Sequence, residues 1–155
     1  MKFEFIPDSD ESEISYQRYH LPRFEFALQK ALKYSNGTVA EVGPFAIASN
    51  LIKEGKRVDG IGFLSEKVKG VNKFIKFNLE SLRETGKPAL SGSYDLVIAA
   101  EIIEHLNIDL NLIYQQLYEL TAPGGILIIQ TPNAVALKKR MSNFVGKNPF
   151  VMIRS

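Results

Sequence analysis

Apolar residues along this chain follow two different spacings. From about Leu21 to Tyr34 they recur every three or four positions, which predicts an amphipathic helix ending at Asn36-Gly37. After this helix, apolar residues occur instead in short and nearly continuous runs. Runs of this length are typical of strands that are buried on both faces of a sheet. The sequence therefore predicts five strands, at residues 38–42, 57–61, 74–77, 94–99 and 126–130.

Helices are predicted between and after these strands. They run through Leu51 and Ile52 to Gly55, around Ser65–Lys69, from about Leu110 to Leu120, and from Ala134 to Val145, and Pro123-Gly124-Gly125 forms a turn before the last strand. Strands that alternate with helices imply a parallel sheet covered by helices. Right-handed crossovers then favour a doubly wound, Rossmann-like α/β fold, with strand order 3-2-1-4-5 expected. Ligands of such folds bind beyond the carboxyl ends of the strands.

Length and composition indicate one globular domain. The 155 residues are 45% hydrophobic and 23% charged, and we expect a single domain over 1–155 with a polar, flexible lead-in at 1–17. The chain has no cysteine, which excludes disulfides and thiolate chemistry and agrees with a cytoplasmic protein. A net charge of +2 does not favour a nucleic-acid or membrane partner. No targeting segment and no apolar run long enough to span a bilayer are recognised.

Three segments at the predicted strand ends carry a family resemblance. They are Thr38-Val-Ala-Glu-Val-Gly43-Pro44, Ser93-Tyr-Asp95-Leu-Val-Ile-Ala-Ala-Glu101-Ile-Ile-Glu104-His105-Leu106, and Leu120-Thr-Ala-Pro-Gly-Gly125-Ile-Leu-Ile-Ile-Gln-Thr131-Pro132-Asn133. These segments resemble the first, fourth and fifth strands, with their loops, of class I S-adenosylmethionine-dependent methyltransferases. The ubiquinone-pathway and sugar-type branch is the most similar, and the resemblance covers roughly residues 18–150. It implies S-adenosylmethionine as cofactor and a small-molecule or sugar-like methyl acceptor.

The resemblance also implies a cofactor site along the strand ends. Its positions here are Glu41, Gly43, Pro44, Phe45, Gly62, Phe63, Asn78, Leu79 and Ala100. Glu41 would receive the cofactor's ammonium group, directly or through water, and Gly43 would leave room for the methionine part. Asn78 would accept a hydrogen bond from the adenine amine, and Leu79 offers a backbone amide. Gly43-Pro44 is also consistent with a plain strand-to-helix turn, and Asn78 with a turn-forming residue.

Two features depart from the family pattern. Phe45 and Ile47 stand where the pattern has glycine, so the Phe45 ring either turns into the core or lies in the cofactor pocket. The second strand is followed by Gly62, at a place where related nucleoside sites carry a carboxylate that binds both ribose hydroxyls. Asp59 does not replace it, because an odd offset along a strand points to the opposite face. Losing that contact costs about 2–3 kcal/mol of binding free energy.

The run Glu101-Ile-Ile-Glu104-His105 is the part of the sequence that most suggests metal binding or catalysis. At helical spacing its two carboxylates and its imidazole would converge on one face, a ligand set that suits magnesium or manganese. The run resembles a metal-binding motif of ubiquinone-pathway O-methyltransferases and small-RNA 2′-O-methyltransferases, which implies Glu101, Glu104 and His105 as metal ligands. Alternatively, these side chains only buttress the loop. His105 is the one candidate catalytic residue, and His20 is expected at the surface.

Related chains continue beyond the Pro149-Phe150 region with strands that cover the fifth strand, whereas this sequence ends at Ser155. A sheet without the usual last two strands leaves the edge formed by residues 126–130 unpaired, so we expect self-association through that edge. The leading functional hypothesis is a methyltransferase acting on a small-molecule or sugar-like acceptor. The alternative is a catalytically inactive methyltransferase fold that serves as a binding or scaffold subunit. A nicotinamide-binding domain ranks third, because the glycine fingerprint of such domains is missing.

Overall fold

The computed structural model describes residues 3–5, 11–43, 45–63, 69–133 and 144. Two predicted helices, around Ser65–Lys69 and from Ala134 to Val145, lie almost entirely outside these ranges.

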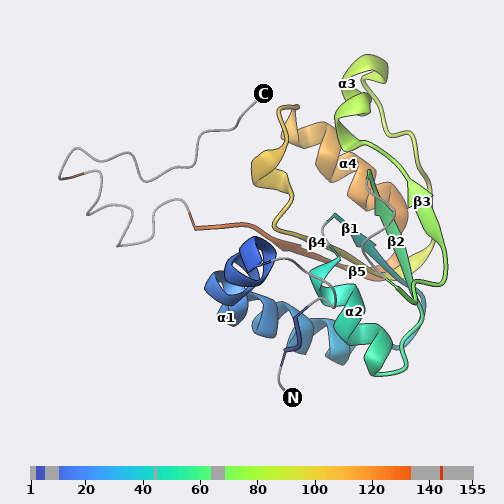
Figure 1. The fold of residues 1–155 in the computed structure, drawn as a ribbon. Coiled ribbons are helices and arrows are strands. Elements are labelled where there is room, and N and C mark those ends of the chain that lie inside the picture. The colour runs from blue at the N-terminus through green and yellow to red at the C-terminus, as the bar shows by residue number, and fades with distance from the viewer. Residues whose placement is uncertain (1–2, 6–10, 44, 64–68, 134–143, 145–155) are drawn as a thin grey trace.

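Five parallel strands form one sheet, as predicted. They are β1 (Val39–Val42), β2 (Val58–Gly62), β3 (Phe74–Lys76), β4 (Tyr94–Ala100) and β5 (Thr121–Gln130). Their order is β3-β2-β1-β4-β5, and every neighbouring pair is parallel. The Rossmann-like fold class is therefore confirmed, with helices on both sides of the sheet (Figure 1).

The register brings the carboxyl ends of the inner strands to one edge of the sheet. Val42 of β1 lies beside Ile61 of β2 and Ala99 of β4. Residues that directly follow these strands therefore meet along this edge. It is here that parallel α/β sheets bind their ligands, because the reversal of strand order opens a crevice between the loops.

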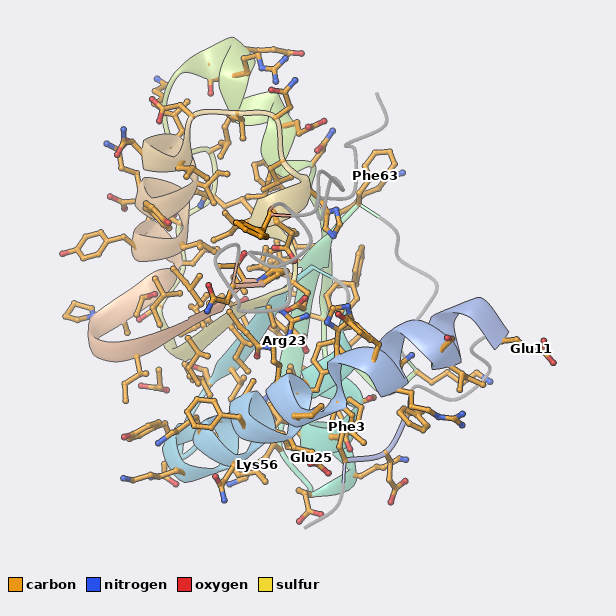
Figure 2. The ribbon with its side chains drawn as sticks, turned by 90° about the vertical axis from the view of Figure 1, so that its left-hand side faces the viewer. Phe3, Glu11, Arg23, Glu25, Lys56 and Phe63 are labelled. Atoms are coloured by element: carbon orange, nitrogen blue, oxygen red, sulfur yellow. The ribbon has the colours of Figure 1, made fainter. Side chains whose placement is uncertain are left out.

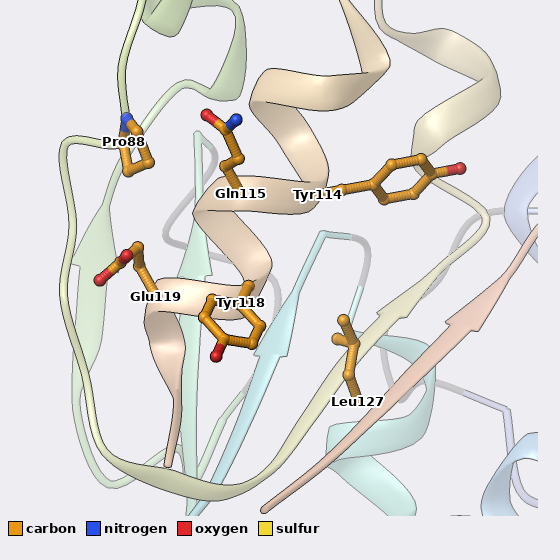
Figure 3. A pocket seen from close by; sticks show the side chains of 6 residues that line it. All are labelled: Pro88, Tyr114, Gln115, Tyr118, Glu119 and Leu127. Carbon is orange, nitrogen blue, oxygen red and sulfur yellow. The ribbon is translucent and has the colours of Figure 1, made fainter. Parts of the chain in front are cut away.

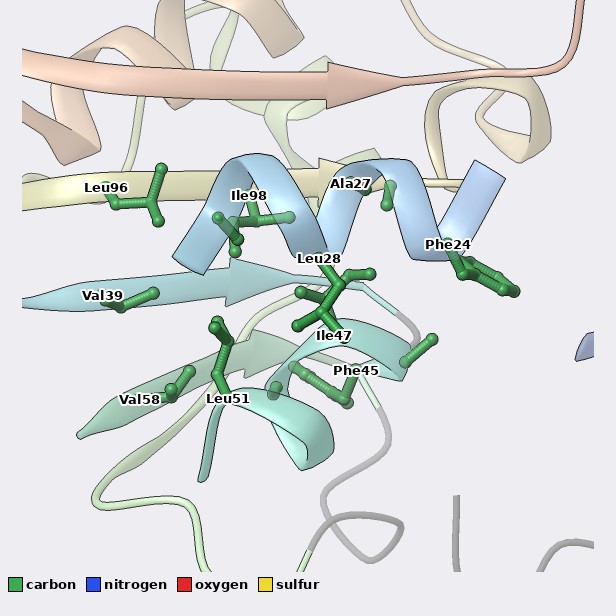
Figure 4. Close-up of a cluster of buried hydrophobic side chains, with 14 of the residues drawn as sticks. Phe24, Ala27, Leu28, Val39, Phe45, Ile47, Leu51, Val58, Leu96 and Ile98 are labelled. Atoms are coloured by element: carbon green, nitrogen blue, oxygen red, sulfur yellow. The ribbon is translucent and has the colours of Figure 1, made fainter. Parts of the chain in front are cut away.

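Two hydrophobic cores fill the two faces of the sheet. Alternate strand residues face opposite sides, so Val39, Val58 and Leu96 belong to one core while Ala40, Ile61 and Val97 belong to the other. Helices α1 (Glu11–Tyr34) and α2 (Ala46–Lys53) cover the first core, which Figure 4 shows in close-up. Helices α3 (Leu82–Thr85) and α4 (Leu110–Leu120) cover the second.

Helix α1 is longer than the sequence predicts. It begins at Glu11, so the expected lead-in at 1–17 is wrong for residues 11–17, and the predicted start at Leu21 is ten residues late. The helix continues through Pro22, although proline cannot donate a backbone hydrogen bond. In its first half the buried side chains include two polar ones, Gln17 and His20. The spacing of apolar residues alone therefore does not reveal this part of the helix. Figure 2 shows the helix from Glu11 past Arg23 toward Glu25.

Strand β5 also begins earlier than predicted. The expected turn, Pro123-Gly124-Gly125, lies within the strand as an irregularity in its pairing with β4. Thr121 pairs with Tyr94, but the next pair joins Ile126 to Leu96, so four β5 residues face one residue of β4. Gly124 accommodates this bulge with a φ of 79°. None of the helices in the described ranges has the length and apolar character needed to cross a membrane.

Strand β5 forms one edge of the sheet, and no strand of the described residues pairs with its outer side. Leu127 and Ile128 pack against the cores, whereas 37% of the surface of Ile129 is exposed. An open edge with an exposed apolar side chain favours pairing with another chain. We therefore propose that the protein self-associates through β5.

Replacing Ile129 by lysine should prevent this association, since a charge on an edge strand opposes the approach of a second edge. Light scattering at micromolar concentration should show an assembly for the unmodified chain and a monomer for Ile129→Lys. The matched control is Phe63→Lys, which adds the same charge at a 61% exposed aromatic residue following β2 and should still assemble. A monomeric unmodified chain would contradict the proposal.

Candidate functional site

The predicted cofactor residues lie along the carboxyl edge of the sheet. Gly43 follows β1, Gly62 ends β2, and Ala100 ends β4. Asn78 and Leu79 come shortly after β3 and begin the 3-10 helix η1 (Leu79–Ser81). Pro44 lies outside the described residues. The strand ends thus bring together positions that are far apart in the sequence, as the fold class requires.

Glu41 lies inside the protein and binds the beginning of α2. Its carboxylate accepts hydrogen bonds from the backbone N–H groups of Ile47, at 3.2 Å, and Ala48. Glu41 is fully buried, and the residue preceding α2 offers no side-chain cap. The carboxylate therefore supplies the acceptor that the first turn of α2 needs. In this arrangement it holds a helix in place, rather than standing open to receive a ligand's ammonium group as the sequence suggested.

Burial has a clear effect on the acidity of Glu41. It raises the pKa of this carboxyl to about 7, because the charged form loses its hydration. The two backbone N–H donors act in the opposite direction and lower the pKa, but by less. The folded protein consequently holds a proton on Glu41 at pH values where the unfolded chain has released it.

The Phe45 ring packs into the core at the end of β2, against the position that Gly62 occupies. Phe45 is 4% exposed, and its ring meets that of Phe74 edge-on, with centroids 5.8 Å apart. Its backbone adopts the left-handed conformation, with φ 62° and ψ 23°. This conformation normally suits glycine, which is the residue the family pattern has there.

Gly43 has a conformation that requires glycine. Its φ is +118°, and a Cβ atom added there would lie 3.0 Å from Cδ1 of Ile102. The Gly43 N–H donates to the carbonyl of Ile61, which keeps the loop against the end of β2. Gly43 therefore keeps the narrow backbone path expected of a loop at a ligand site, and Ile102 lies directly against it.

The residues after β2 and β3 have mixed environments. Asn78 is exposed, and its side-chain oxygen accepts a hydrogen bond from the N–H of Glu80 at 3.0 Å, which matches the turn-forming interpretation. Leu79 is buried in the core on the α3 and α4 side. Phe63 is 61% exposed, and the ammonium of Lys76 lies 5.9 Å from the centre of its ring.

Asp59 lies on the opposite face of the sheet from Gly62, as predicted. Its carboxylate accepts hydrogen bonds from the Tyr94 hydroxyl at 3.0 Å and from the Asn72 amide. Tyr94 packs against the core of α3 and α4, whereas a side chain at Gly62 would face Phe45 in the other core. No carboxylate of β2 therefore takes the place of the missing ribose contact.

The structure does not support the predicted metal triad. Residues 101–105 do not form an α-helix, because Glu101 has φ 54° and the 3-10 helix η2 covers only Ile103–His105. The Glu101 side chain is fully buried, while 63% of the His105 side chain is exposed. Within the described ranges, no three histidine or acidic side chains are grouped to hold a metal ion. Helical spacing brings ligands together only where the chain is helical, and here it is not.

Glu101 instead belongs to a network that the sequence did not reveal. Its carboxylate lies 3.1 Å from Nη2 of Arg23 and 3.6 Å from Nδ1 of His20, both on α1, and it accepts a hydrogen bond from Nε2 of Gln130 at 3.2 Å. His20 is only 9% exposed, so its expected surface position is wrong. The only sequence signal is the spacing of His20 and Arg23, which places them on one side of a helix.

Burial raises the pKa of Glu101 to about 7. Arg23 lowers this pKa by attracting the charged form, and the nearby Glu104 carboxylate raises it. Glu104 in turn accepts a hydrogen bond from the Thr131 hydroxyl at 3.3 Å. The network therefore ties α1 to the loop after β4 and to the end of β5, at the edge where the predicted cofactor residues lie.

A pocket of about 540 Å³ lies away from this edge. It is bounded by Pro88, Tyr114, Gln115, Tyr118, Glu119 and Leu127, between α4 and β5 (Figure 3). None of the predicted cofactor or metal residues lines it. It lies beside α4 and β5, and not in the crevice at the carboxyl ends of the strands, where α/β sheets bind nucleosides.

Glu41→Gln should remove one pH-dependent part of the stability. Because the folded pKa is raised above the ordinary 4.5, the wild-type free energy of unfolding falls by about 2–3 kcal/mol as pH rises from 4.5 to 8 through the titration of Glu41. The variant should lie close to wild type at pH 5 and become relatively more stable at pH 8. Urea unfolding at both pH values measures this, with the exposed Glu119→Gln as control. Parallel pH profiles would contradict it.

Arg23→Gln should destabilise the protein more at pH 8 than at pH 5.5. Arg23 favours the charged form of Glu101, so its loss raises the pKa of Glu101 further and leaves a buried charge unpaired only where Glu101 is ionised. We expect about 1–2 kcal/mol of additional loss at the higher pH, reduced because Arg23 is partly exposed. Arg18→Gln, an exposed arginine on the same helix, is the control. Equal losses at both pH values would refute this role.

Solved structures similar to this chain support the fold. A SAM dependent methyltransferase from Archaeoglobus fulgidus matches with TM-score 0.59 and 18% identity, over 88% of this chain and 65% of its own. The PH0226 protein from Pyrococcus horikoshii matches with TM-score 0.59 and 21% identity, over 90% and 63%. An S-adenosylmethionine dependent methyltransferase from Mesorhizobium loti has TM-score 0.51 and 16% identity, over 71% and 52%. The chain thus spans less than two thirds of the length of each of these proteins.

Sequence comparison gives the family. No curated protein sequence matches the chain significantly. A family model described as a methyltransferase domain matches residues 17–149, which is most of the chain and includes all five strands. The sheet order agrees with this match. The chain belongs to this methyltransferase domain family.

Proposed function

We propose that this chain is an S-adenosylmethionine-dependent methyltransferase that acts on a small-molecule or sugar-like acceptor. The observation that carries the proposal is the family match over residues 17–149, combined with a sheet whose loops meet at one edge. Two of the similar structures are described as methyltransferases that depend on this cofactor. The cysteine-free composition favours a cytoplasmic location.

The residues at the edge fit the cofactor in part. Gly43 keeps the glycine of the family loop, with a φ of +118°, and the space that its Cβ would take is filled by Ile102. Asn78 retains a second lone pair on its carbonyl oxygen for an adenine amine, and it is exposed. Gly62 offers no ribose contact. When bound, the cofactor supplies an electrophilic methyl group, and the chain's own task is to hold the acceptor in line with it.

In this proposal the Glu101 network supports the part of the site that holds the acceptor. It joins α1, the loop after β4 and the end of β5 through contacts of 3.1–3.6 Å. Fixing these three elements relative to one another would keep the acceptor position constant, since small displacements of a reacting group cost much of the rate.

A second candidate function is a binding or scaffold subunit without catalysis. Two observations favour it: Gly62 lacks the ribose carboxylate, and Phe45 lies where the family pattern has glycine. The two functions differ in whether the nucleoside part of the cofactor binds to the chain at all. A binding measurement therefore separates them.

Calorimetric titration with S-adenosylhomocysteine tests the proposal. We expect binding with a dissociation constant on the order of 10–100 μM, weak because the ribose carboxylate is missing. Gly43→Ala should weaken it, since the added Cβ would meet Ile102 at 3.0 Å and the φ of +118° is strained for alanine, so the loop at the proposed site must move. Gly86→Ala is the matched control, because Gly86 also has a positive φ, of 63°, but no atom lies within 4 Å of an added Cβ. No binding by the folded, unmodified chain would favour the scaffold function.

A further inference from the structure

Three residues at the end of β2 are coupled by direct contact. A Cβ atom added at Gly62 would lie 3.0 Å from Cζ of the Phe45 ring, and one added at Gly60 would lie 3.2 Å from its Cε1. Both distances are too short for an unperturbed contact between carbon atoms, since favourable separations are about 3.5–4.0 Å. At Gly62 the ring therefore occupies the volume that a side chain would need. At Gly60 an added Cβ would lie closer still to Cδ2 of Phe74, at 3.1 Å, so the two rings together fill that space.

The backbone does not explain the two glycines. Gly60 and Gly62 lie within β2, and neither has the positive φ that makes glycine necessary at Gly43. Glycine within a strand is unfavourable and usually marks a close approach of another group. At Gly62 that group is the Phe45 ring, which Figure 4 shows among the core side chains, and at Gly60 it is the rings of Phe74 and Phe45. The two departures from the family pattern therefore depend on each other: with the Phe45 ring in this position, there is no room for a carboxylate at position 62.

The position of the ring involves two opposing contributions. Its burial and its edge-on contact with Phe74 stabilise the inward orientation. The left-handed backbone of Phe45 disfavours it, because a residue with a Cβ atom is strained there. Strained residues of this kind persist only where packing holds them, and they are found at sites that switch between two states.

We propose that the Phe45 ring is a plug that closes the nucleoside site, and that a ribose-bearing ligand binds only after the ring has moved outward. The proposal rests on the cofactor-binding function proposed above. It assigns to Phe45 the control of ligand affinity: the fraction of molecules with the ring displaced sets the apparent dissociation constant. It also explains why no side chain is present at position 62, since a carboxylate there would collide with the closed ring.

The first experiment measures the coupling by thermal unfolding, without any ligand. Gly62→Ala should lower the melting temperature of the wild-type chain by several degrees, on the order of 4 °C, because the methyl group meets the ring. In a Phe45→Gly background the same substitution should have no cost. Phe45→Leu, which keeps more apolar volume, serves if Phe45→Gly is unstable. Phe24→Leu is the control background: Phe24 is 1% exposed in the same core but does not contact Gly62, so the cost should remain.

The second experiment is the titration of S-adenosylhomocysteine into the same proteins. Phe45→Gly should bind about tenfold more tightly than wild type if roughly nine molecules in ten are closed. Phe24→Leu should bind like the wild type. Phe45→Gly with Gly62→Asp should bind more tightly still, since the carboxylate then has room and reaches the ribose hydroxyls.

The outcomes separate this proposal from the function on which it rests. If Gly62→Ala lowers the melting temperature equally in wild type, Phe45→Gly and Phe24→Leu, position 62 is not in contact with the Phe45 ring and the proposal is wrong. Binding of the same strength by wild type and Phe45→Gly would overturn the plug while leaving the methyltransferase function intact. Absence of binding in every folded variant would overturn the proposed function, and the plug with it. We expect Phe45→Gly to bind the ligand more tightly than wild type. In this background we also expect Gly62→Ala to leave the melting temperature unchanged.

Discussion

The hydrogen bonds from the N–H groups of Ile47 and Ala48 to the carboxylate of Glu41 determine the arrangement of the candidate site. They connect the middle of β1 to the first turn of α2, and so fix the path of the connecting loop. The residue before α2 does not cap the helix with its side chain, so the buried Glu41 carboxylate accepts the hydrogen bonds of the first turn instead. The loop must then turn sharply, which places Gly43 at φ +118° and Phe45 in the left-handed conformation. Phe45 enters the core as a result.

The inward position of Phe45 sets the shape of the neighbouring strand end. The ring lies where a side chain at position 62 would be, and it shares the space beside position 60 with the Phe74 ring. The family pattern that the sequence resembles has glycine at position 45 and a ribose-binding carboxylate at position 62. This chain has a phenylalanine at the first position and a glycine at the second. Close packing makes such changes interdependent, because interiors have little free volume to absorb one of them alone.

The opposite half of the edge depends on charge rather than volume. The buried Glu101 carboxylate is held by Arg23 and His20 from α1 and by Gln130 at the end of β5. A buried carboxylate without such partners would be strongly unfavourable. The requirement explains why α1 extends over the strand ends and why its early turns are polar yet buried. The apolar half near β2 and the polar half near β4 and β5 thus face each other across the end of β1.

The sequence by itself determined the strands, their parallel order and the family, because burial on both faces and the spacing of glycine and polar residues are local properties of the chain. It also located Gly43, Gly62 and Glu101 at strand ends. Only the tertiary structure decided what these residues contact. Periodicity could not show that α1 reaches back to Glu11, that Arg23 pairs with Glu101, or that the Phe45 ring fills the space above Gly62. Each of these depends on which elements pack together, and residues distant in sequence meet only after the sheet has formed.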